Sequence, residues 1–285
     1  MIFEFLTMPK INLILAGGGA RFGAYIGALY ALKEKGIEIE KIVGISGGSI
    51  ISSLYASGHS LERLKELMLE MDFTKFKDFS PFAILGGMGL YKGKRFEKWI
   101  DKELKGKKFS DEFMLDHYIV ATDILRGRPV IFSKRSFAEL KVSKAVRFSI
   151  GIPLFYSYKK FSFGKTGHGI MVDGNIATFP LEDIFYQDKY STLTLRLAIS
   201  KADFVGASKR FSKFTYPYRL VRLLMNSLER ERIVGGRWRN TIIIFSGNIS
   251  ATRFDLSREE KLYLFEQGYN QVKENLKKVV LHSDK

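Results

Sequence analysis

The sequence contains no cysteine and only four histidines, at positions His59, His117, His168 and His282. Without cysteine the chain forms no disulfide bond and offers no thiol nucleophile, which suits a reducing compartment. No paired histidines or clustered carboxylates stand at the spacing of metal ligands, so we expect a reaction without a metal or other cofactor. A catalytic triad whose histidine follows the acid has only His282, near the end of the sequence, to draw on. His168 stands in a glycine-rich stretch that we interpret as a surface loop.

Long apolar runs are also missing, since no uncharged apolar segment approaches the roughly 18 to 20 residues that span a bilayer. The first eight residues include Glu4 and no basic residue, which argues against a cleaved signal peptide. We therefore expect a cytoplasmic protein, peripheral wherever it meets a membrane, while export without a cleaved signal stays open. The 285 residues, 46% hydrophobic and 27% charged, suffice for one large core. We predict a single domain over residues 1–285.

Glycine is abundant where two apolar runs end. The segment Gly44-Ile-Ser-Gly-Gly48 follows a short strand-like run and precedes a helical pattern over residues 50–56. A serine in this G-x-S-x-G frame suits a nucleophile on a sharp strand-to-helix turn, because Gly44 and Gly48 remove side chains that would clash there. Ser46 is therefore the first candidate nucleophile, although glycine-serine clusters are also ordinary loop composition.

The second glycine cluster, Gly17 to Gly19, ends an apolar run that begins at Ile11 and is followed by a helical pattern. Backbone N–H groups at such a junction can bind an anion, either the pyrophosphate of a dinucleotide or the oxyanion formed when an acyl carbonyl is attacked. The dinucleotide pattern G-x-G-x-x-G fits poorly, because Phe22 occupies the position of its third glycine. We favour the oxyanion interpretation, and a simple tight turn is the alternative.

Together these segments give the chain a resemblance to the patatin-like phospholipase family of acyl hydrolases. Residues 17–21 resemble the family's glycine-rich oxyanion segment with its following arginine, residues 44–48 resemble its nucleophile elbow, and Asp173-Gly174 resembles its Asp-Gly motif. The order and spacing of these motifs also match, and the resemblance covers about residues 10–185. Further family-like segments are residues 119–123, 145–149, 152–153 and 172–175.

The resemblance implies a Ser-Asp dyad in which Asp173 is the base for Ser46, and an acyl-enzyme that water resolves. It also implies the fold class, which is α/β, a patatin-like three-layer sandwich with a mostly parallel central sheet flanked by helices. Residues 186–285 would add strands and helices packed on the family-like core. The implied site consists of the catalytic Ser46 and Asp173, the oxyanion hole of Gly17, Gly18, Gly19 and Arg21, and the elbow glycines Gly44 and Gly48.

Two positions depart from the family's usual pattern. Phe22 stands where many relatives carry glycine after the arginine, and Asn175 stands where glycine or alanine is more usual. Phe22 would narrow the oxyanion site or shift the first helix, although neither departure removes a catalytic side chain. Taken without the resemblance, residues 173–175 are an ordinary turn signature, and for Arg21 a solvated side chain at a helix start is an equal alternative.

Strand and helix signals alternate along the rest of the chain, which favours a largely parallel sheet with helices on both faces. The last helix has the clearest pattern. Residues 257–260 form a capping box, and the apolar residues that follow with helical spacing are Leu262, Phe265, Tyr269, Val272 and Leu276. Further strands are predicted over residues 118–122, 130–132, 192–199 and 241–245, and further helices over residues 61–71, 95–104 and 138–149.

The formal net charge is +16, from 46 basic and 30 acidic residues, so partners should be anionic. The excess gathers in residues 92–108, with eight basic and three acidic side chains, and in residues 209–222, with five basic and none acidic. The second cluster interleaves aromatic side chains, which suits an anionic membrane surface. Nucleic acid is the competing partner, without a binding motif to support it, and plain solvated faces are the simplest alternative. The predicted membrane contacts are Lys209, Arg210, Phe211, Lys213 and Phe214.

Three functions are therefore open. The first is a serine acyl hydrolase that cleaves lipid esters, of the phospholipase A or lysophospholipase type. The second is a carboxylesterase without phospholipid substrates. The third is a catalytically silent membrane-binding module, which would follow if Phe22 obstructs the oxyanion site.

Overall fold

The computed structural model of the chain describes residues 9–80, 89–177, 184–185, 188–199 and 240–279, together with positions 216, 219, 220 and 223. The membrane contacts predicted over residues 209–214, and His282, lie outside the described residues. Within the described part, no helix combines the length and the apolar character that crossing a bilayer requires.

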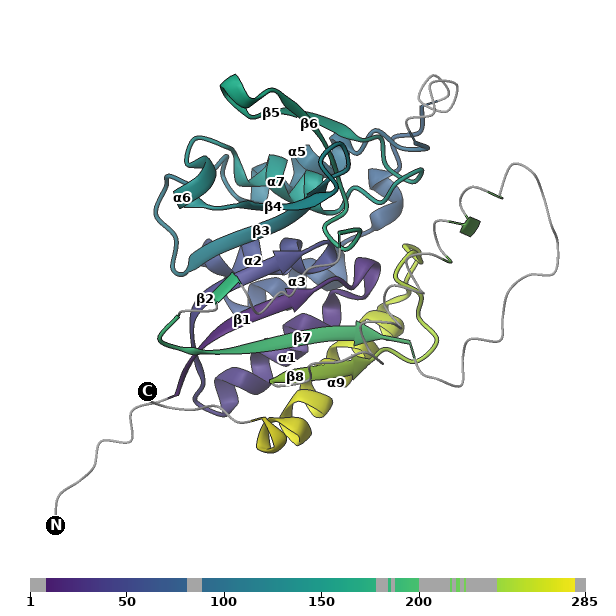
Figure 1. Cartoon of the computed structure of the whole chain (residues 1–285). Coiled ribbons are helices and arrows are strands. Elements are labelled where there is room, and N and C mark those ends of the chain that lie inside the picture. Colours follow the sequence, from purple (N-terminus) through teal and green to yellow (C-terminus); the bar gives the residue numbers. More distant parts are fainter. Residues whose placement is uncertain are drawn as a thin grey trace, which may run out of the picture.

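Eight strands among the described residues form one sheet, in the order β5-β6-β3-β2-β1-β7-β8 with β4 paired to β3 (Figure 1). The strands β1, β2, β3, β7 and β8 pair in parallel, whereas β4, β5 and β6 pair antiparallel on the side of β3. The predicted α/β class with a mostly parallel sheet is confirmed. The strands are β1 (Lys10–Ala16), β2 (Glu38–Ile45), β3 (Asp116–Asp123), β4 (Arg128–Phe132), β5 (Lys159–Ser162), β6 (His168–Val172), β7 (Ser191–Ala198) and β8 (Thr241–Phe245).

The sequence patterns do not predict β5 and β6. Both strands are short, and Gly169 inside β6 weakens the strand signal because glycine contributes no side chain to a sheet face. Here a Cβ at Gly169 would lie 2.6 Å from the Phe163 ring and 2.8 Å from Asp123 Oδ2, so the missing side chain makes room for neighbours. His168 is exposed as predicted, but it begins β6, and the loop predicted for it is wrong.

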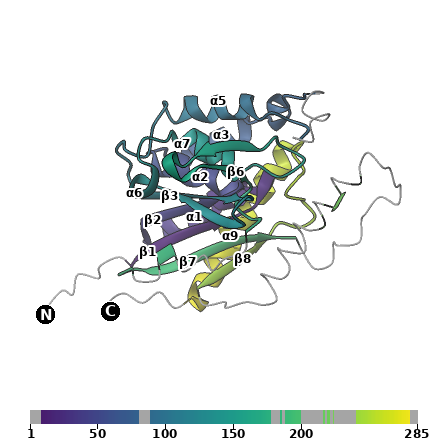
Figure 2. The same ribbon diagram turned by 45° about the horizontal axis from the view of Figure 1, so that its top comes forward.

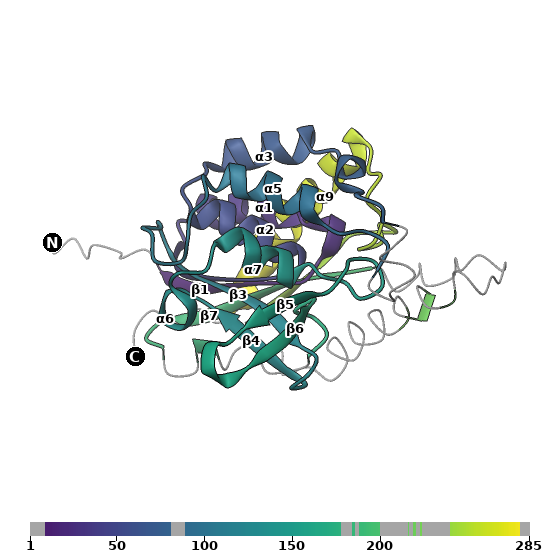
Figure 3. The same cartoon turned by 90° about the horizontal axis from the view of Figure 1, so that it is seen from above.

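The long helices gather on one face of the sheet, as the view from above shows (Figure 3). Leu13 and Leu15 of β1 belong to the large core on that face, whereas Ile14 and Val43 pack with Phe185 on the other. The sequence predicts helices on both faces of the sheet. Among the described residues, the long helices lie on one face. The helices are α1 (Gly23–Glu34), α2 (Gly47–Ala56), α3 (Leu61–Glu70), α5 (Lys94–Glu103), α6 (Lys134–Phe137), α7 (Val142–Ser149) and α9 (Arg258–Asn275), with 3-10 turns at Gly19–Arg21, Phe73–Phe76, Gly164–Thr166 and Leu276–Lys278.

The C-terminal helix α9 lies against α1 in close backbone contact (Figure 2). A Cβ at Gly268 would stand 1.8 Å from Ala24 O, and one at Gly27 would stand 1.9 Å from Phe265 O. The capping box at Ser257 is confirmed, and of the predicted apolar stripe Val272 and Leu276 are buried while Phe265 and Tyr269 pack partly buried against the core. The helix also buries Lys261, Leu264 and Gly268, which that stripe does not include. The two helices come closest at glycines, so a pattern of apolar side chains alone does not locate their contact.

The helix predicted over residues 138–149 begins later, at Val142. The chain first forms the short α6, whose capping box joins Ser133 and Ser136. The N–H group of Val142 then donates to Lys107 O at 3.0 Å, so the backbone before α7 bonds to another segment instead of to a preceding helical turn. The helix nevertheless ends at Ser149 as predicted, next to the candidate site.

Candidate active site

Ser46 lies on a sharp turn between β2 and α2. Its backbone adopts φ 50° and ψ −127°, a region that costs a residue with a side chain of order 1–3 kcal/mol. A Cβ at Gly44 would stand 2.0 Å from Ser52 Oγ, and a Cβ at Gly48 would stand 2.2 Å from Leu15 O. The two glycines flanking the serine are thus required by close packing of the turn on β1 and on its own helix.

The Ser46 hydroxyl donates to Asp173. The distance from Ser46 Oγ to Asp173 Oδ2 is 2.7 Å, and the residues are 3% and 0% exposed. Asp173 directly follows β6, where its N–H group donates to Gly151 O at 2.9 Å and its carbonyl accepts from Thr122 Oγ1 at 2.9 Å. A buried carboxylate in direct contact with a strained serine can accept the hydroxyl proton as the oxygen attacks.

Ser149, at the end of α7, forms hydrogen bonds both with Ser46 and with the residue that follows Asp173. Its hydroxyl accepts from the Ser46 N–H at 2.8 Å and donates to Val120 O at 2.6 Å. Its carbonyl accepts from the Gly174 N–H at 3.1 Å. Nothing in its local sequence distinguishes Ser149 from an ordinary helix serine, so a role beside Ser46 is visible only in the folded chain.

The glycine loop after β1 lies against the Ser46 turn. Gly17, Gly18 and Gly19 all have positive φ angles, at 83°, 110° and 54°, which favour glycine strongly. The N–H group of Gly17 is used, since it donates to Ile45 O at 3.1 Å. Among the hydrogen bonds of the described residues, none uses the N–H groups of Gly18, Gly19 or Gly47.

The loop and the turn approach so closely that Gly47 is also required. A Cβ at Gly47 would stand 2.4 Å from Gly19 O, and a Cβ at Gly19 would stand 2.1 Å from Ala251 O. Gly47 is the first residue of α2, where the helix presents its N-terminal N–H groups and partial positive charge. Donors from two segments therefore lie at one end of the sheet beside Ser46.

Arg21 lies behind the glycine loop. It is 1% exposed, and its Nε and Nη1 donate to Gly18 O at 3.1 Å and Ser246 Oγ at 3.3 Å. Its Nη2 donates to Leu197 O at 3.5 Å. These contacts support the backbone of the loop, and Arg21 does not line the cavity beside Ser46. The solvated side chain considered as an alternative for Arg21 is wrong.

The cavity beside Ser46 is small and apolar. Its volume is about 20 Å³, room for roughly one water molecule. Phe22 does not line it, because that ring is buried edge-on against Phe73 at 5.3 Å. The sequence patterns missed the apolar lining, since its members come from five separate segments. The lining consists of Gly19, Ser46, Gly47, Ile50, Phe73, Phe96, Ile150, Ile152, Tyr156 and Phe254.

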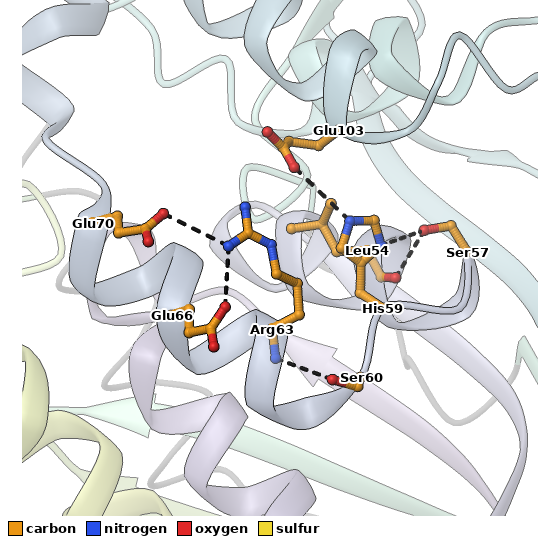
Figure 4. A network of polar contacts seen from close by, with 8 residues as sticks. All are labelled: Leu54, Ser57, His59, Ser60, Arg63, Glu66, Glu70 and Glu103. Atoms are coloured by element: carbon orange, nitrogen blue, oxygen red, sulfur yellow. Dashed lines mark hydrogen bonds and ion pairs between the residues drawn. The ribbon is translucent and has the colours of Figure 1, made fainter.

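None of the described histidines contacts Ser46 or Asp173. His117 is buried against the rings of Phe109 and Phe113, and burial lowers its pKa to about 3. His59 belongs to a separate polar network that joins the end of α2 to α3 and α5, where its Nε2 lies 3.9 Å from Glu103 (Figure 4). Burial also lowers the pKa of His59. Among the described residues, no three carboxylate or imidazole side chains gather as metal ligands would.

The family model of the patatin-like phospholipases matches residues 13–185 of the chain. The chain therefore belongs to the patatin-like phospholipase family, and the predicted resemblance is confirmed. The match includes the glycine loop, Ser46 and Asp173, all of which the structure brings to one end of the sheet.

Two curated relatives match the chain almost from end to end. YqhO of Bacillus subtilis is 28% identical over 278 residues, covering 90% of this chain and 95% of the relative. A protein of Acanthamoeba polyphaga mimivirus is 29% identical over 287 residues, covering 95% of each. Human patatin-like phospholipase domain-containing protein 6 is 34% identical over 121 residues, which span 42% of this chain and 9% of the relative.

The fold is shared with solved structures of low sequence identity. VipD of Legionella pneumophila aligns with a TM-score of 0.64 at 15% identity, over 95% of this chain and 67% of the other. The type III effector ExoU aligns with a TM-score of 0.55 at 16% identity, over 95% of this chain and 53% of the other. These similarities concern the arrangement of the strands and helices.

Proposed function

We propose that the protein is a serine acyl hydrolase that cleaves lipid esters, of the phospholipase A or lysophospholipase type. The observation that carries the proposal is the 2.7 Å contact between Ser46 Oγ and Asp173 Oδ2 on a strained, glycine-flanked turn. Membership of the patatin-like phospholipase family supports the same reaction class.

In the proposed reaction, Asp173 Oδ2 takes the hydroxyl proton while Ser46 Oγ bonds to the ester carbonyl carbon. The negative charge that develops on the carbonyl oxygen is stabilised by the N–H groups of Gly18, Gly19 and Gly47. Collapse of the tetrahedral intermediate breaks the bond to the alcohol, which leaves with the proton from Asp173. Water then attacks the acyl-enzyme with Asp173 again as base, which releases the fatty acid and restores Ser46.

Arg21 and Ser149 act in this proposal as positioning residues. Arg21 holds the carbonyl of Gly18, so the N–H group that follows it, on Gly19, keeps its direction. Ser149 accepts from the Ser46 N–H, which fixes the backbone from which the nucleophile projects. Gly17 has a related role, since its N–H and C=O groups bond to Ile45 and Gly48 across the turn.

A lipid acyl group suits the apolar lining of the cavity, with four aromatic side chains close to the nucleophile. The volume of about 20 Å³ favours the second candidate, a carboxylesterase for short acyl groups, unless side chains move to admit a longer chain. The silent membrane module is less well supported, because Phe22 packs against Phe73 and leaves the oxyanion donors open.

We also propose contact with an anionic membrane surface. Helix α5 turns Phe96 and Ile100 into the core, and Phe96 lines the cavity beside Ser46. The same helix exposes Lys94, Lys98 and Lys102, so basic groups lie on the outer side of a helix whose inner side borders the site. The charge of this helix complements acidic headgroups. The second basic cluster, Lys209 to Phe214, would add to it.

A fluorophosphonate probe and a lipid panel test the proposed reaction together. The probe should label the folded wild-type protein at Ser46, and mass spectrometry should detect fatty acid and lysolipid released from phospholipids. Ser57→Ala, at the far end of the same helix, is the matched control and should behave as wild type. Labelling with release of short-chain acids alone would establish the carboxylesterase, and neither labelling nor release would reject both enzymatic candidates.

A further inference from the structure

A second cavity lies beyond the wall of the first. It has a volume of about 10 Å³ and is lined by Phe76, Lys77, Tyr91 and Phe155 on its own side. We call it the outer cavity, and the one beside Ser46 the inner cavity. Three residues line both, so they form the partition between them, which we call the aromatic wall: Phe73, Tyr156 and Phe254.

Tyr156 is the best-anchored member of the wall. Its N–H group donates to Ile152 O at 2.9 Å, and the next residue donates to Tyr91 O at 2.8 Å. Its ring stacks under the guanidinium of Arg147 at 4.8 Å. Arg147 is itself 1% exposed and donates through Nη2 to Lys92 O and Ser157 O, at 2.8 and 2.7 Å. A buried, charged clamp therefore holds Tyr156 between two chain segments.

Phe73 is also fixed. It begins a 3-10 turn that is capped by Asp72, whose side chain accepts from the Thr74 N–H at 2.9 Å. The ring is 7% exposed, with Phe22 at 5.3 Å on one side and Phe76 at 6.1 Å on another. Displacing it would disturb the core beneath α1 and the turn together.

Phe254 is the least constrained of the three. It is only partly buried and lies in the stretch between β8 and α9, which has no helix or strand. This stretch is anchored just before the ring, by Ala251 O accepting from the Ala20 N–H at 2.8 Å and by Arg253 pairing with Glu260 of α9 at 2.7 Å. The ring itself is held by other rings, since it stacks on Phe155 at 5.0 Å and 28° and meets Phe73 at 5.7 Å.

We infer that Phe254 is the residue that sets acyl-chain length in this site. In the structure its ring helps to close the inner cavity, which at about 20 Å³ disfavours long acyl groups at Ser46 more than short ones. Rotation of the Phe254 ring away from Phe73 and Tyr156 joins the two cavities into one largely aromatic channel that leads outward from Ser46 and gives a longer acyl chain a path. This inference rests on the proposed acyl hydrolase function and adds the specificity determinant of that site.

The test is a length series of p-nitrophenyl esters with acyl chains of 4 to 16 carbons, assayed with the wild type, Phe254→Ala and Phe254→Trp. The readout is the ratio of kcat/KM for the 12-carbon ester to kcat/KM for the 4-carbon ester. Removing the ring should raise this ratio at least tenfold, and the larger Trp ring should lower it. Phe137→Ala is the matched control, because Phe137 is partly buried in an aromatic cluster that lines neither cavity.

A ratio within twofold of wild type in both folded Phe254 variants, or an equal shift in the Phe137→Ala control, would overturn the inference. Binding measured in a Ser46→Ala background separates this result from failure of the reaction itself. Fatty alcohols of 4 to 16 carbons compete there with a fluorescent apolar probe, and Phe254→Ala should strengthen binding of the long alcohols at least tenfold. If no ester is hydrolysed but this shift is seen, the channel stands and the proposed reaction fails; unchanged affinities reject the channel.

Discussion

Ser46 is held by hydrogen bonds from several segments of the chain, whereas Phe254, on the opposite side of the cavity, is held by contacts with other rings. On the polar side, Asp173 and Ser149 bond to the serine, and the glycine loop bonds to the turn that carries it. On the apolar side, Phe254 rests on Phe155 without a regular element to fix it. Directional bonds fix the position of reacting atoms, while ring contacts tolerate repacking. Under the proposed function, the comparison indicates a firmly held reaction centre beside an acyl site whose rings can repack.

The largest expected effect comes from removing the nucleophile on the rigid side. Ser46→Ala should reduce ester hydrolysis by about 10⁴-fold or more, by analogy with deletion of other catalytic serines. The variant should still fold, because the substitution removes only the hydroxyl oxygen and the backbone N–H of residue 46 still bonds to Ser149. Turnover of a purified, folded variant by steady-state assay checks this. More than a tenth of wild-type activity would exclude Ser46 as the nucleophile.

Asp173→Asn keeps the shape of the base but removes its capacity to accept the proton. Turnover should fall by about 10³-fold or more, while the amide still accepts from the Asn175 N–H as Asp173 Oδ1 does at 2.8 Å. His168→Ala and His282→Ala are the comparison variants and should stay within a few-fold of wild type. A dead histidine variant beside an active Asp173→Asn would replace the dyad by a histidine mechanism. Thermal melts confirm that each variant is folded.

The close approach of the two glycine segments predicts an intermediate effect. In Gly47→Ala the new Cβ meets Gly19 O at 2.4 Å, so the oxyanion donors must separate and kcat should fall about 10²-fold. Gly127→Ala is the control, since a Cβ there meets nothing within 4 Å, although the φ of 61° costs stability. Single-turnover kinetics on both variants should show slow acylation in Gly47→Ala alone. Equal kinetics would remove the loop contact from the mechanism.

The helix that follows Ser46, α2, contacts a buried histidine whose protonation depends on pH. His117 Nε2 lies 3.2 Å from Ser52 Oγ, and burial lowers the pKa of His117 from 6.5 to about 3. Between these values the unfolded state binds a proton that the folded state does not, so stability is present above pH 6.5 and is lost as pH falls toward 3. At pH 5 the loss amounts to about 2 kcal/mol, roughly 30-fold in the unfolding equilibrium.

Urea unfolding at pH 7 and pH 5 measures this loss. In His117→Gln the titrating group is gone, so the difference between the two pH values should shrink by about the same amount. An unchanged difference would assign the acid sensitivity to other groups.

The smallest effect concerns the outer surface of α5. Replacing Lys94, Lys98 or Lys102 singly by Gln should weaken sedimentation with anionic vesicles by about fivefold each, because a basic residue near such a surface contributes about 1 kcal/mol. Lys35→Gln, an exposed lysine at the end of α1, should change little. Binding should also weaken as salt rises. Equal binding to neutral and anionic vesicles would reject an electrostatic membrane contact.

The polar side of the site was predictable because its backbone conformation and close packing require glycine at particular positions of the sequence. A serine with positive φ between tightly packed chains needs glycine at Gly44 and Gly48, and a loop of three positive φ angles needs Gly17 to Gly19. The family resemblance then supplied Asp173, which local patterns alone leave as a turn residue. Strand and helix periodicity likewise placed most of the sheet and the capped start of α9.

The apolar side was not predictable, because phenylalanine is common in any core and its partners are distant in the sequence. Neither Phe73 nor Phe254 lies in a helix or strand that the sequence predicts. The contact line of α9 and the short strands β5 and β6 were missed for a related reason. Each depends on a glycine, Gly268 in α9 and Gly169 in β6, whose missing side chain lets neighbouring atoms approach closely. Such information exists only once the chain has folded.

Strand β6, which directly precedes Asp173, pairs with β3 over a very short ladder. β6 meets β3 only at Thr122 with Val172 and at Asp123 with Met171. The nucleophile and its proposed base lie far apart in the sequence, and they meet only after β3, α7 and β6 have all docked. A partly folded chain thus carries both residues without an assembled dyad. Under the proposed function, a chain whose β6 has not docked cannot hydrolyse an ester, because its nucleophile lacks its base.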